Sequence, residues 1–288
     1  MKVRVLPAVQ FADLLSEPWV DHSRKPYVYE ALAYIPVREG YSYTDILPER
    51  RRKARGYQVI GDLVAFHGEK PEQSEINEVL VRHQPRGVFW YKGHKGDLRI
   101  PDIYLIYGEL GEVLHKESGI YYWFDVTKVM FSQGNLEEKR RIAGLIRPGE
   151  KICDMFAGIG YFTLPMAKAG GYVHAIELNP DSYQYLIRNI STNNLTDFII
   201  PNLGDCGKQI TGLYDRICMG HFDAVSYLPD ALSCSTTGTI LHLHSIGDVT
   251  GEIERCLSDA GLSAEISCRL IKKIGPYKEH MVSDVVIV

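Results

Sequence analysis

The sequence predicts an α/β protein with a largely parallel sheet, preceded by a smaller α+β domain. Three observations lead to this class. Between residues 126 and 288, apolar strand-like runs alternate with amphipathic helix-like runs at the spacing of βαβ units. A glycine-containing turn follows the first strand. The last apolar run follows its predecessor with no helix between them.

The segments of this region follow one another in order. The first helix, at 136–146, has one apolar face and ends before Pro148 and Gly149. Strands are predicted at the short apolar runs, 151–156, 172–178, 197–203, 214–221, 238–246, 263–274 and 280–288. Helices are predicted between them, after the glycines at 158 and 160, from Pro180 onward, and at 223–233 and 249–261.

The last two strands should form an antiparallel hairpin, because a parallel return needs a crossover of about a dozen residues or more. The sheet then has seven strands, five parallel and a final antiparallel pair. This is the Rossmann-like arrangement of AdoMet-dependent transferases.

Residues 1–125 have a different texture, rich in Tyr, Pro and Arg, with short apolar runs between turn residues. Its clearest helix is PEQSEINEVLVRH, at 71–83. We therefore predict a small α+β domain at 1–125 and a second domain at 126–288.

Composition narrows the class of protein. The chain has 45% hydrophobic and 24% charged residues, near the globular average, and a net charge of −4, so any nucleic-acid contact must come from local patches. Its six cysteines form no C-x-x-C pair, which argues against a disulfide framework or a zinc site and fits a reducing cytoplasm. No metal is expected. No signal peptide or membrane-spanning segment is predicted.

The stretch DMFAGIGYF, at 154–162, is the turn after the first strand of the second domain. Gly158 and Gly160 would let the backbone approach a ligand at a helix N-terminus. The alternative is a tight strand-to-helix connection without a ligand. A dinucleotide fingerprint would place its third glycine where Thr163 stands, which counts against NAD.

Acidic residues follow the next two strands. Glu177 lies 19 residues after Gly158, where a carboxylate can accept hydrogen bonds from both hydroxyls of a ribose. Asp205 and Cys206 follow the third strand, where an acid and a backbone N–H can bind the adenine edge. The alternatives are a surface acid for Glu177 and a helix cap for Asp205. Together with the absent third glycine, these positions predict an adenosine site without a pyrophosphate.

The segment before the first helix adds further candidates. Ser132 precedes Lys139 by about two helical turns, so a helix between them could bring both side chains to the edge of one pocket. The lysine ammonium would there suit the carboxylate of the methionine part of AdoMet. The alternative for Lys139 is a place on a basic helix face exposed to solvent. Arg140 either belongs to that face or contacts RNA. Glu137 and Glu138 are possible general bases, between which the spacing does not choose.

These residues carry a family resemblance. FDVTKVMFSQGNLEEKRRIAGLIRPGEKICDMFAGIGYFTLPMAKAG, followed by HAIELNP and RICMGH, resembles the tRNA wybutosine-synthesizing aminocarboxypropyltransferases of archaea and eukaryotes. It is also similar to their sister family, the tRNA guanine-N1-methyltransferases that act at position 37. The resemblance covers about residues 97–248. It implies S-adenosyl-L-methionine (AdoMet) as co-substrate, with Asp154 and Phe156 among its contacts. Tyr161 and Phe162 would shield the sulfonium from water; the alternative is ordinary core packing, which we expect for Phe162.

The end of the fourth strand separates the two families. The methyltransferases have Asn-Leu-Pro there, whereas this chain has Met219, Gly220 and His221, as in the aminocarboxypropyltransferases. We expect Gly220 to open room for a tricyclic base and Met219 to provide an apolar wall. His221 is either part of that wall or a structural histidine.

The resemblance implies transfer of the 3-amino-3-carboxypropyl group of AdoMet to C7 of 4-demethylwyosine at position 37 of tRNA(Phe), with release of 5'-methylthioadenosine. A guanine-N1-methyltransferase and a non-catalytic tRNA-binding protein are the alternatives. The expected partner is the tRNA anticodon region, with no membrane and no obligate protein partner. The basic run of Arg50, Arg51, Arg52 and Lys53 is the predicted RNA contact, with a solvated charged face as its alternative.

Overall fold

The structure is a computed structural model that describes residues 2–24, 26–29, 31–46, 56–96, 99–131, 135–275 and 278–288. The chain forms two compact units, Met1–Arg55 and Gly56–Val288. The domain boundary predicted between residues 125 and 126 therefore lies inside the second unit. There the strands before it pack against helices after it and share one apolar cluster with them.

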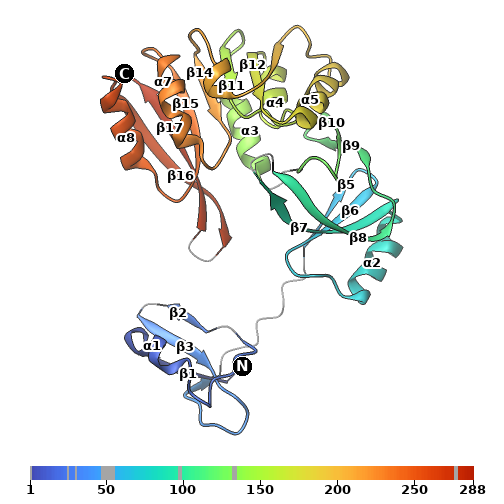
Figure 1. Cartoon of the computed structure of the whole chain (residues 1–288), viewed down its shortest axis with the longest axis vertical. Helices are drawn as coiled ribbons and strands as arrows, with labels where there is room; N and C mark the ends of the chain where they lie inside the picture. Colours follow the sequence, from blue (N-terminus) through green and yellow to red (C-terminus); the bar gives the residue numbers. More distant parts are fainter. Residues whose placement is uncertain are drawn as a thin grey trace. The chain divides into compact units, whose positions relative to one another are not determined.

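The first unit is a small antiparallel sheet with the strand order β2-β3-β1-β4 (Figure 1). Its strands are β1 (Lys2–Pro7), β2 (Tyr27–Tyr29), β3 (Leu32–Pro36) and β4 (Asp45–Ile46), with η1 (Ala8–Gln10) and α1 (Phe11–Leu14) after β1. Trp19, Val20 and Ile35 are in its core.

The second unit begins with a mixed sheet of order β5-β6-β7-β8, covered on one face by α2 (Gln73–His83). The strands are β5 (Tyr57–Ile60), β6 (Leu63–His67), β7 (Gly87–Lys95) and β8 (Ile100–Gly108). A hairpin follows, of β9 (Glu112–Glu117) and β10 (Ile120–Asp125).

The main sheet has seven strands in the order β13-β12-β11-β14-β15-β17-β16 (Figure 1). They are β11 (Lys151–Asp154), β12 (Tyr172–Glu177), β13 (Ile199–Leu203), β14 (Arg216–Met219), β15 (Ile240–Ile246), β16 (Ala264–Gly275) and β17 (Lys278–Ile287). The first five are parallel, and β17 is antiparallel to both β15 and β16. The predicted Rossmann-like sheet, with its terminal hairpin, is confirmed.

Helices cover both faces of this sheet. On one face α3 (Leu136–Leu145), α4 (Thr163–Lys168) and α5 (Pro180–Thr192) share an apolar cluster with β11 and β12. The other cluster joins the opposite face of β11 to α6 (Cys206–Gln209), η3 (Ala224–Tyr227), α7 (Leu228–Ser233) and α8 (Thr250–Asp259). Alternation along β11 explains this division, since Ile152 and Cys153 belong to different clusters.

Helix α5 binds the free edge of β10 through its side chains. Asn189 accepts a hydrogen bond from the Trp123 N–H at 2.6 Å and donates one to the Trp123 carbonyl at 3.1 Å. Asn193, one turn later, does the same for Tyr121 at 2.9 and 2.8 Å. These amides replace a neighbouring strand, so the hairpin is fixed against the main sheet within the second unit.

None of the helices in the described part of the chain is both long and apolar enough to cross a membrane.

Candidate active site

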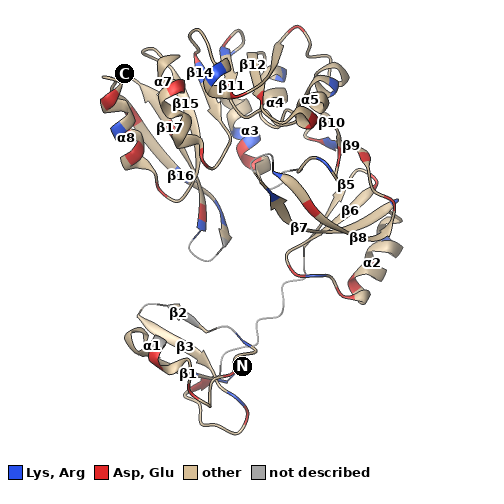
Figure 2. Cartoon of the chain, viewed as in Figure 1, with Lys and Arg blue, Asp and Glu red and all other residues tan. Residues whose placement is uncertain are grey.

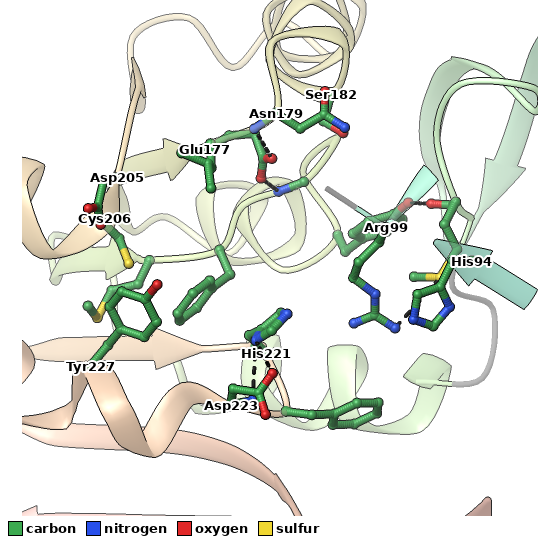
Figure 3. A pocket seen from close by; sticks show the side chains of 18 of the residues that line it. His94, Arg99, Glu177, Asn179, Ser182, Asp205, Cys206, His221, Asp223 and Tyr227 are labelled. Carbon is green, nitrogen blue, oxygen red and sulfur yellow. Dashed lines mark hydrogen bonds and ion pairs between the residues drawn. The ribbon is translucent and has the colours of Figure 1, made fainter. Parts of the chain in front are cut away.

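A pocket of about 470 Å³ lies at the carboxyl ends of β11, β12, β13 and β14, within the second unit. Ligands of open parallel sheets bind at this edge, where the loops leave the strands. Asp205 and Cys206 lie at one end of the pocket and His94 and Arg99 at the other, with Glu177 and His221 on opposite sides between them (Figure 3).

The two predicted glycines have different roles. Gly158 lines the pocket at φ +57°, and a Cβ there would lie 2.7 Å from the Tyr161 ring. Gly160, at φ +102°, is not part of the lining, and a Cβ there would lie 2.8 Å from the Leu164 side chain. Gly158 therefore exposes backbone to the pocket, whereas Gly160 allows helix α4 to pack closely.

Glu177 joins the ends of β11 and β12. Its Oε2 accepts a hydrogen bond from the Gly158 N–H at 2.7 Å, and its Oε1 accepts one from the Asn179 N–H at 2.7 Å (Figure 3). Burial raises the pKa of this carboxyl group. Each carboxylate oxygen retains lone-pair capacity, so the group can still accept hydrogen bonds from two vicinal hydroxyls of a ribose.

Asp154 supports the loop from beneath. It is fully buried and accepts hydrogen bonds from Thr163 Oγ1 at 2.7 Å and from the Phe156 N–H at 3.3 Å. Burial raises its pKa to about 6. Thr163, at the position of the absent third glycine, is thus the partner of Asp154, and Asp154 is not part of the pocket lining.

The end of the pocket that Asp205 and Cys206 line also contains Phe156 and Tyr227. Asp205 accepts a hydrogen bond from the Gly207 N–H at 3.0 Å, so it both caps α6 and lines the pocket. The Phe156 ring stacks on His221 at 5.3 Å and meets Tyr227 edge-on at 5.4 Å. These rings form an apolar surface on which a purine can stack.

The end of β14 differs in part from expectation. Gly220 and His221 line the pocket, but Met219 is fully buried in the core and is not part of the lining. A Cβ on Gly220 would lie 3.2 Å from the Phe162 ring. Gly220 therefore leaves space for the Phe162 ring, which lies behind the pocket lining. We had expected the glycine to leave space for a tricyclic base instead.

Lys139 also lies behind the residues that line the pocket. Its ammonium forms an ion pair with Glu117 at 2.6 Å, and the two side chains are 3% and 7% exposed. The rings of Phe131 and Tyr161 lie 5.4 Å from it. Burial lowers its pKa, and Glu117 opposes that shift. Lys139 thus supports Tyr161, a lining residue, from the far side and does not itself line the pocket.

The other predicted site residues either lie away from the pocket or fall outside the residues that the structure describes. Arg140 is exposed and donates a hydrogen bond to Ser118 Oγ at 3.1 Å. Glu138 is buried in an ion pair with Arg141 at 2.5 Å, and neither Glu137 nor Glu138 lines the pocket. The remaining predictions, Ser132 and the run of Arg50, Arg51, Arg52 and Lys53, lie outside the described residues.

The β7–β8 hairpin supplies two lining residues that the sequence argument did not assign to this site. A bulge between Tyr91 and Gly93 breaks the pairing register of the hairpin. The extra residue turns His94 to the face opposite to the one that regular alternation would give it, toward the pocket. In the sequence, HKGDLR at 94–99 shows only basic residues close to an aromatic run, and this pattern does not point to a pocket.

Arg99, in the turn immediately before β8, has a left-handed backbone with φ +52°. Among the lining residues that the structure describes, it is the only arginine or lysine. Its guanidinium lies 5.5 Å from the Phe222 ring centre, and its Nε is buried without a hydrogen-bond partner in the described chain. Burial lowers its pKa. The pocket thus presents a fixed cation with donor capacity to spare.

No cluster of histidine, cysteine and carboxylate side chains suited to a metal occurs in the portion of the chain that the structure describes.

Known proteins resemble this chain over most of its length. The family described as "TRM5/TYW2 methyltransferase domain" matches residues 113–266. A tRNA(Phe) (4-demethylwyosine(37)-C(7)) aminocarboxypropyltransferase of Methanocaldococcus jannaschii is 35% identical over 241 residues, covering 79% of this chain and 96% of that protein. The crystal structure of Pyrococcus horikoshii TYW2 in complex with MeSAdo has a TM-score of 0.71 and 29% identity, covering 81% and 90% of the two chains.

The methyltransferase branch is also represented. A tRNA (guanine(37)-N(1))-methyltransferase Trm5b of Pyrococcus abyssi is 32% identical over 280 residues, covering 91% of this chain and 81% of that protein. From the matched domain and the near-complete coverage of the M. jannaschii protein, it follows that this chain belongs to the TRM5/TYW2 methyltransferase domain family.

Proposed function

We propose that the protein transfers the 3-amino-3-carboxypropyl group of AdoMet to C7 of 4-demethylwyosine at position 37 of tRNA(Phe), releasing 5'-methylthioadenosine. One observation carries the proposal: a relative with this activity in its name aligns over 96% of its own length at 35% identity. The pocket agrees with it, since Gly158, Glu177 and Asp205 meet at the strand ends where an adenosine would bind.

AdoMet would lie along the pocket. Glu177 would accept hydrogen bonds from the ribose hydroxyls, and the adenine would lie beside Phe156, Asp205 and Cys206. Arg99, at the opposite end, would bind the carboxylate of the methionine arm by charge-assisted hydrogen bonds. Lys139, Asp154 and Gly160 would act from behind by holding the loop and Tyr161 in place.

The reaction is chosen by geometry, because a sulfonium activates three carbons toward a nucleophile. The carbon that lies in line with C7, at about 3 to 3.5 Å, is the one that reacts. Attack on the methionine Cγ breaks the bond from Cγ to sulfur, and the electron pair remains on sulfur as 5'-methylthioadenosine. Each tenfold preference for Cγ over the methyl carbon corresponds to about 1.4 kcal/mol between the two transition states.

The partner in this proposal is the anticodon region of tRNA, and the place of action is the cytoplasm. Helices α3 and α8 each carry both acidic and basic residues (Figure 2), so neither helix presents a surface of one charge sign for RNA. Local contacts are proposed instead, from the run of Arg50, Arg51, Arg52 and Lys53 and from Arg140.

The test compares two tRNA substrates. With AdoMet and tRNA(Phe) that carries 4-demethylwyosine, the protein should release 5'-methylthioadenosine and add the aminocarboxypropyl mass to the base. With tRNA that carries guanine at position 37, the protein should release neither 5'-methylthioadenosine nor S-adenosylhomocysteine. Mass spectrometry of the small molecules and of the tRNA digest reads both outcomes.

A guanine-N1-methyltransferase is the second candidate, favoured by the match to Trm5b over 91% of this chain. It requires S-adenosylhomocysteine as by-product from the guanine-37 tRNA. Release of neither by-product would instead favour a non-catalytic tRNA-binding protein.

A further inference from the structure

The proposed reaction leaves one proton unassigned. When C7 attacks the methionine Cγ, the new carbon–carbon bond forms while C7 still carries its hydrogen, so the ring becomes cationic. Loss of that proton restores the aromatic ring, and the electron pair of the C7–H bond returns to it. We propose that His94 is the general base that accepts this proton, an inference that rests on the proposed function.

The position of His94 supports this role. It lies with Arg99 at the end of the pocket opposite to Asp205 and Cys206 (Figure 3). An adenosine held by Glu177 and Asp205 directs its methionine arm, and so the reacting carbon, toward the end that His94 lines. The bulge at Tyr91–Gly93 is the local feature that brings His94 to this face.

None of the three carboxylates that line the pocket is placed to act as the base. Glu177 accepts two backbone hydrogen bonds at 2.7 Å and faces the ribose position. Asp205 caps α6 at the adenine end. Asp223 lies beside His221 with its side chain 84% exposed, and a carboxylate in water is a weaker base than an imidazole.

His221, the other lining histidine, is held in the wrong form for a base. The Asp223 N–H donates a hydrogen bond to His221 Nδ1 at 3.2 Å. Because Nδ1 accepts, the proton of the neutral ring lies on Nε2. His221 can then donate a hydrogen bond to the substrate but has no free nitrogen lone pair to accept its proton.

The two phenol groups that line the pocket, Tyr161 and Tyr227, are unsuited as well. Tyr161 donates its hydroxyl proton to the Met130 carbonyl, and burial raises its pKa far above neutrality. Burial also raises the pKa of Tyr227. Neither phenol is therefore ionised near pH 7.

The charges around His94 keep it ready to accept a proton. Burial lowers its pKa, and Arg99 of the same hairpin and His221 of the loop after β14 lower it further. Asp223 offsets part of the Arg99 charge. His94 is thus neutral near pH 7. The side chain is only partly buried, so it can pass the accepted proton to water, and the Arg99 cation favours that step.

The main experiment uses the full chain with His94→Gln, and His22→Gln, an exposed histidine in the first unit, as the matched control. His94→Gln should bind AdoMet as wild type does by calorimetry but lower kcat by about 10²- to 10⁴-fold. The acid limb of the wild-type pH profile should disappear in this variant. A tRNA carrying deuterium at C7 should show a primary isotope effect in the variant, because proton removal becomes rate-limiting.

A second variant keeps the proposal testable if glutamine perturbs the loop. His94→Ala should regain activity with added imidazole, and the rescue should increase with the fraction of neutral imidazole. The proposal is wrong if His94→Gln keeps the wild-type rate and acid limb, or if the limb disappears in His221→Gln instead. A wild-type protein that releases no 5'-methylthioadenosine would contradict the proposed function itself, which is a separate result.

Discussion

At the scale of single residues, one carboxylate organises the pocket. Glu177 holds the N–H groups of Gly158 and Asn179, which belong to the loops after two neighbouring strands. The same oxygens are the proposed acceptors for the ribose hydroxyls. Its contribution to cofactor binding can therefore be measured apart from the fold, which depends on the apolar clusters of the sheet.

We predict that Glu177→Ala weakens AdoMet binding by about 1.5 to 3 kcal/mol, the usual value of hydrogen bonds to a charged group. Calorimetry measures the affinity and circular dichroism the fold. Glu254→Ala, an exposed glutamate of α8, is the control and should bind as wild type does. An unchanged affinity in a folded Glu177→Ala protein would remove this residue from the site.

The contact between Gly220 and Phe162 gives a second prediction at this scale. Gly220→Ala places a methyl group about 3.2 Å from the Phe162 ring, so the free energy of unfolding should fall by roughly 1 to 3 kcal/mol. Phe162→Leu in the same chain should recover part of this loss, because the smaller side chain can move away. A double-mutant cycle from denaturant unfolding measures the coupling, and strictly additive losses would show that the two residues do not interact.

At the scale of elements, a largely buried ionic network attaches α3 to the main sheet. Arg141 of α3 donates to both oxygens of Asp284 on β17, at 2.8 and 3.0 Å, and Asp284 also contacts His242 Nδ1 of β15 at 2.6 Å. His242 Nε2 lies 2.7 Å from Arg216 Nη1 on β14. A neutral His242 satisfies both contacts, since Nδ1 donates and Nε2 accepts.

This network predicts a pH dependence of stability. Burial alone would raise the pKa of Asp284 above 3.8, but hydrogen bonds from His242 and Arg141 outweigh it and lower the pKa to about 2. The folded pKa is below the unfolded one, so the stabilisation is present above about pH 4 and is lost as the pH falls toward 2. The amount lost is about 2 kcal/mol.

Asp284→Asn should therefore lower the free energy of unfolding at pH 7 by about 3 kcal/mol, and the difference from wild type should narrow by about 2 kcal/mol near pH 2. Urea unfolding at several pH values gives both numbers. Asp259→Asn, an exposed aspartate of α8, is the control. A difference that stays constant from pH 7 to pH 2 would contradict the ionic account.

Local sequence predicted the sheet and part of the site, but it did not predict the features that depend on contacts between distant segments. Strand ends and a turn located Gly158, Glu177 and Asp205, because each depends only on its own βα connection. Lys139 has its partner, Glu117, on a separate hairpin, and no local pattern shows that pairing. His94 reaches the pocket through a bulge, which shifts the alternation on which a sequence argument depends.

At the scale of the whole molecule, tRNA binding should depend on salt through the basic run at 50–53. Replacing Arg50, Arg51, Arg52 and Lys53 by neutral residues should weaken tRNA binding and reduce the slope of log K against log salt by roughly 0.7 to 0.9 for each lost phosphate contact. AdoMet affinity, measured in parallel, should not change. The same slope in wild type and variant would mean that this run is a solvated surface.

The central claim is that the larger arm of AdoMet, and not its methyl group, reaches the tRNA. A double-label experiment tests it directly, with AdoMet carrying ³H in the methyl group and ¹⁴C in the carboxyl group, and with tRNA(Phe) carrying 4-demethylwyosine. The account predicts that ¹⁴C enters the tRNA while ³H leaves with 5'-methylthioadenosine. Incorporation of ³H without ¹⁴C would contradict it and identify the protein as a methyltransferase.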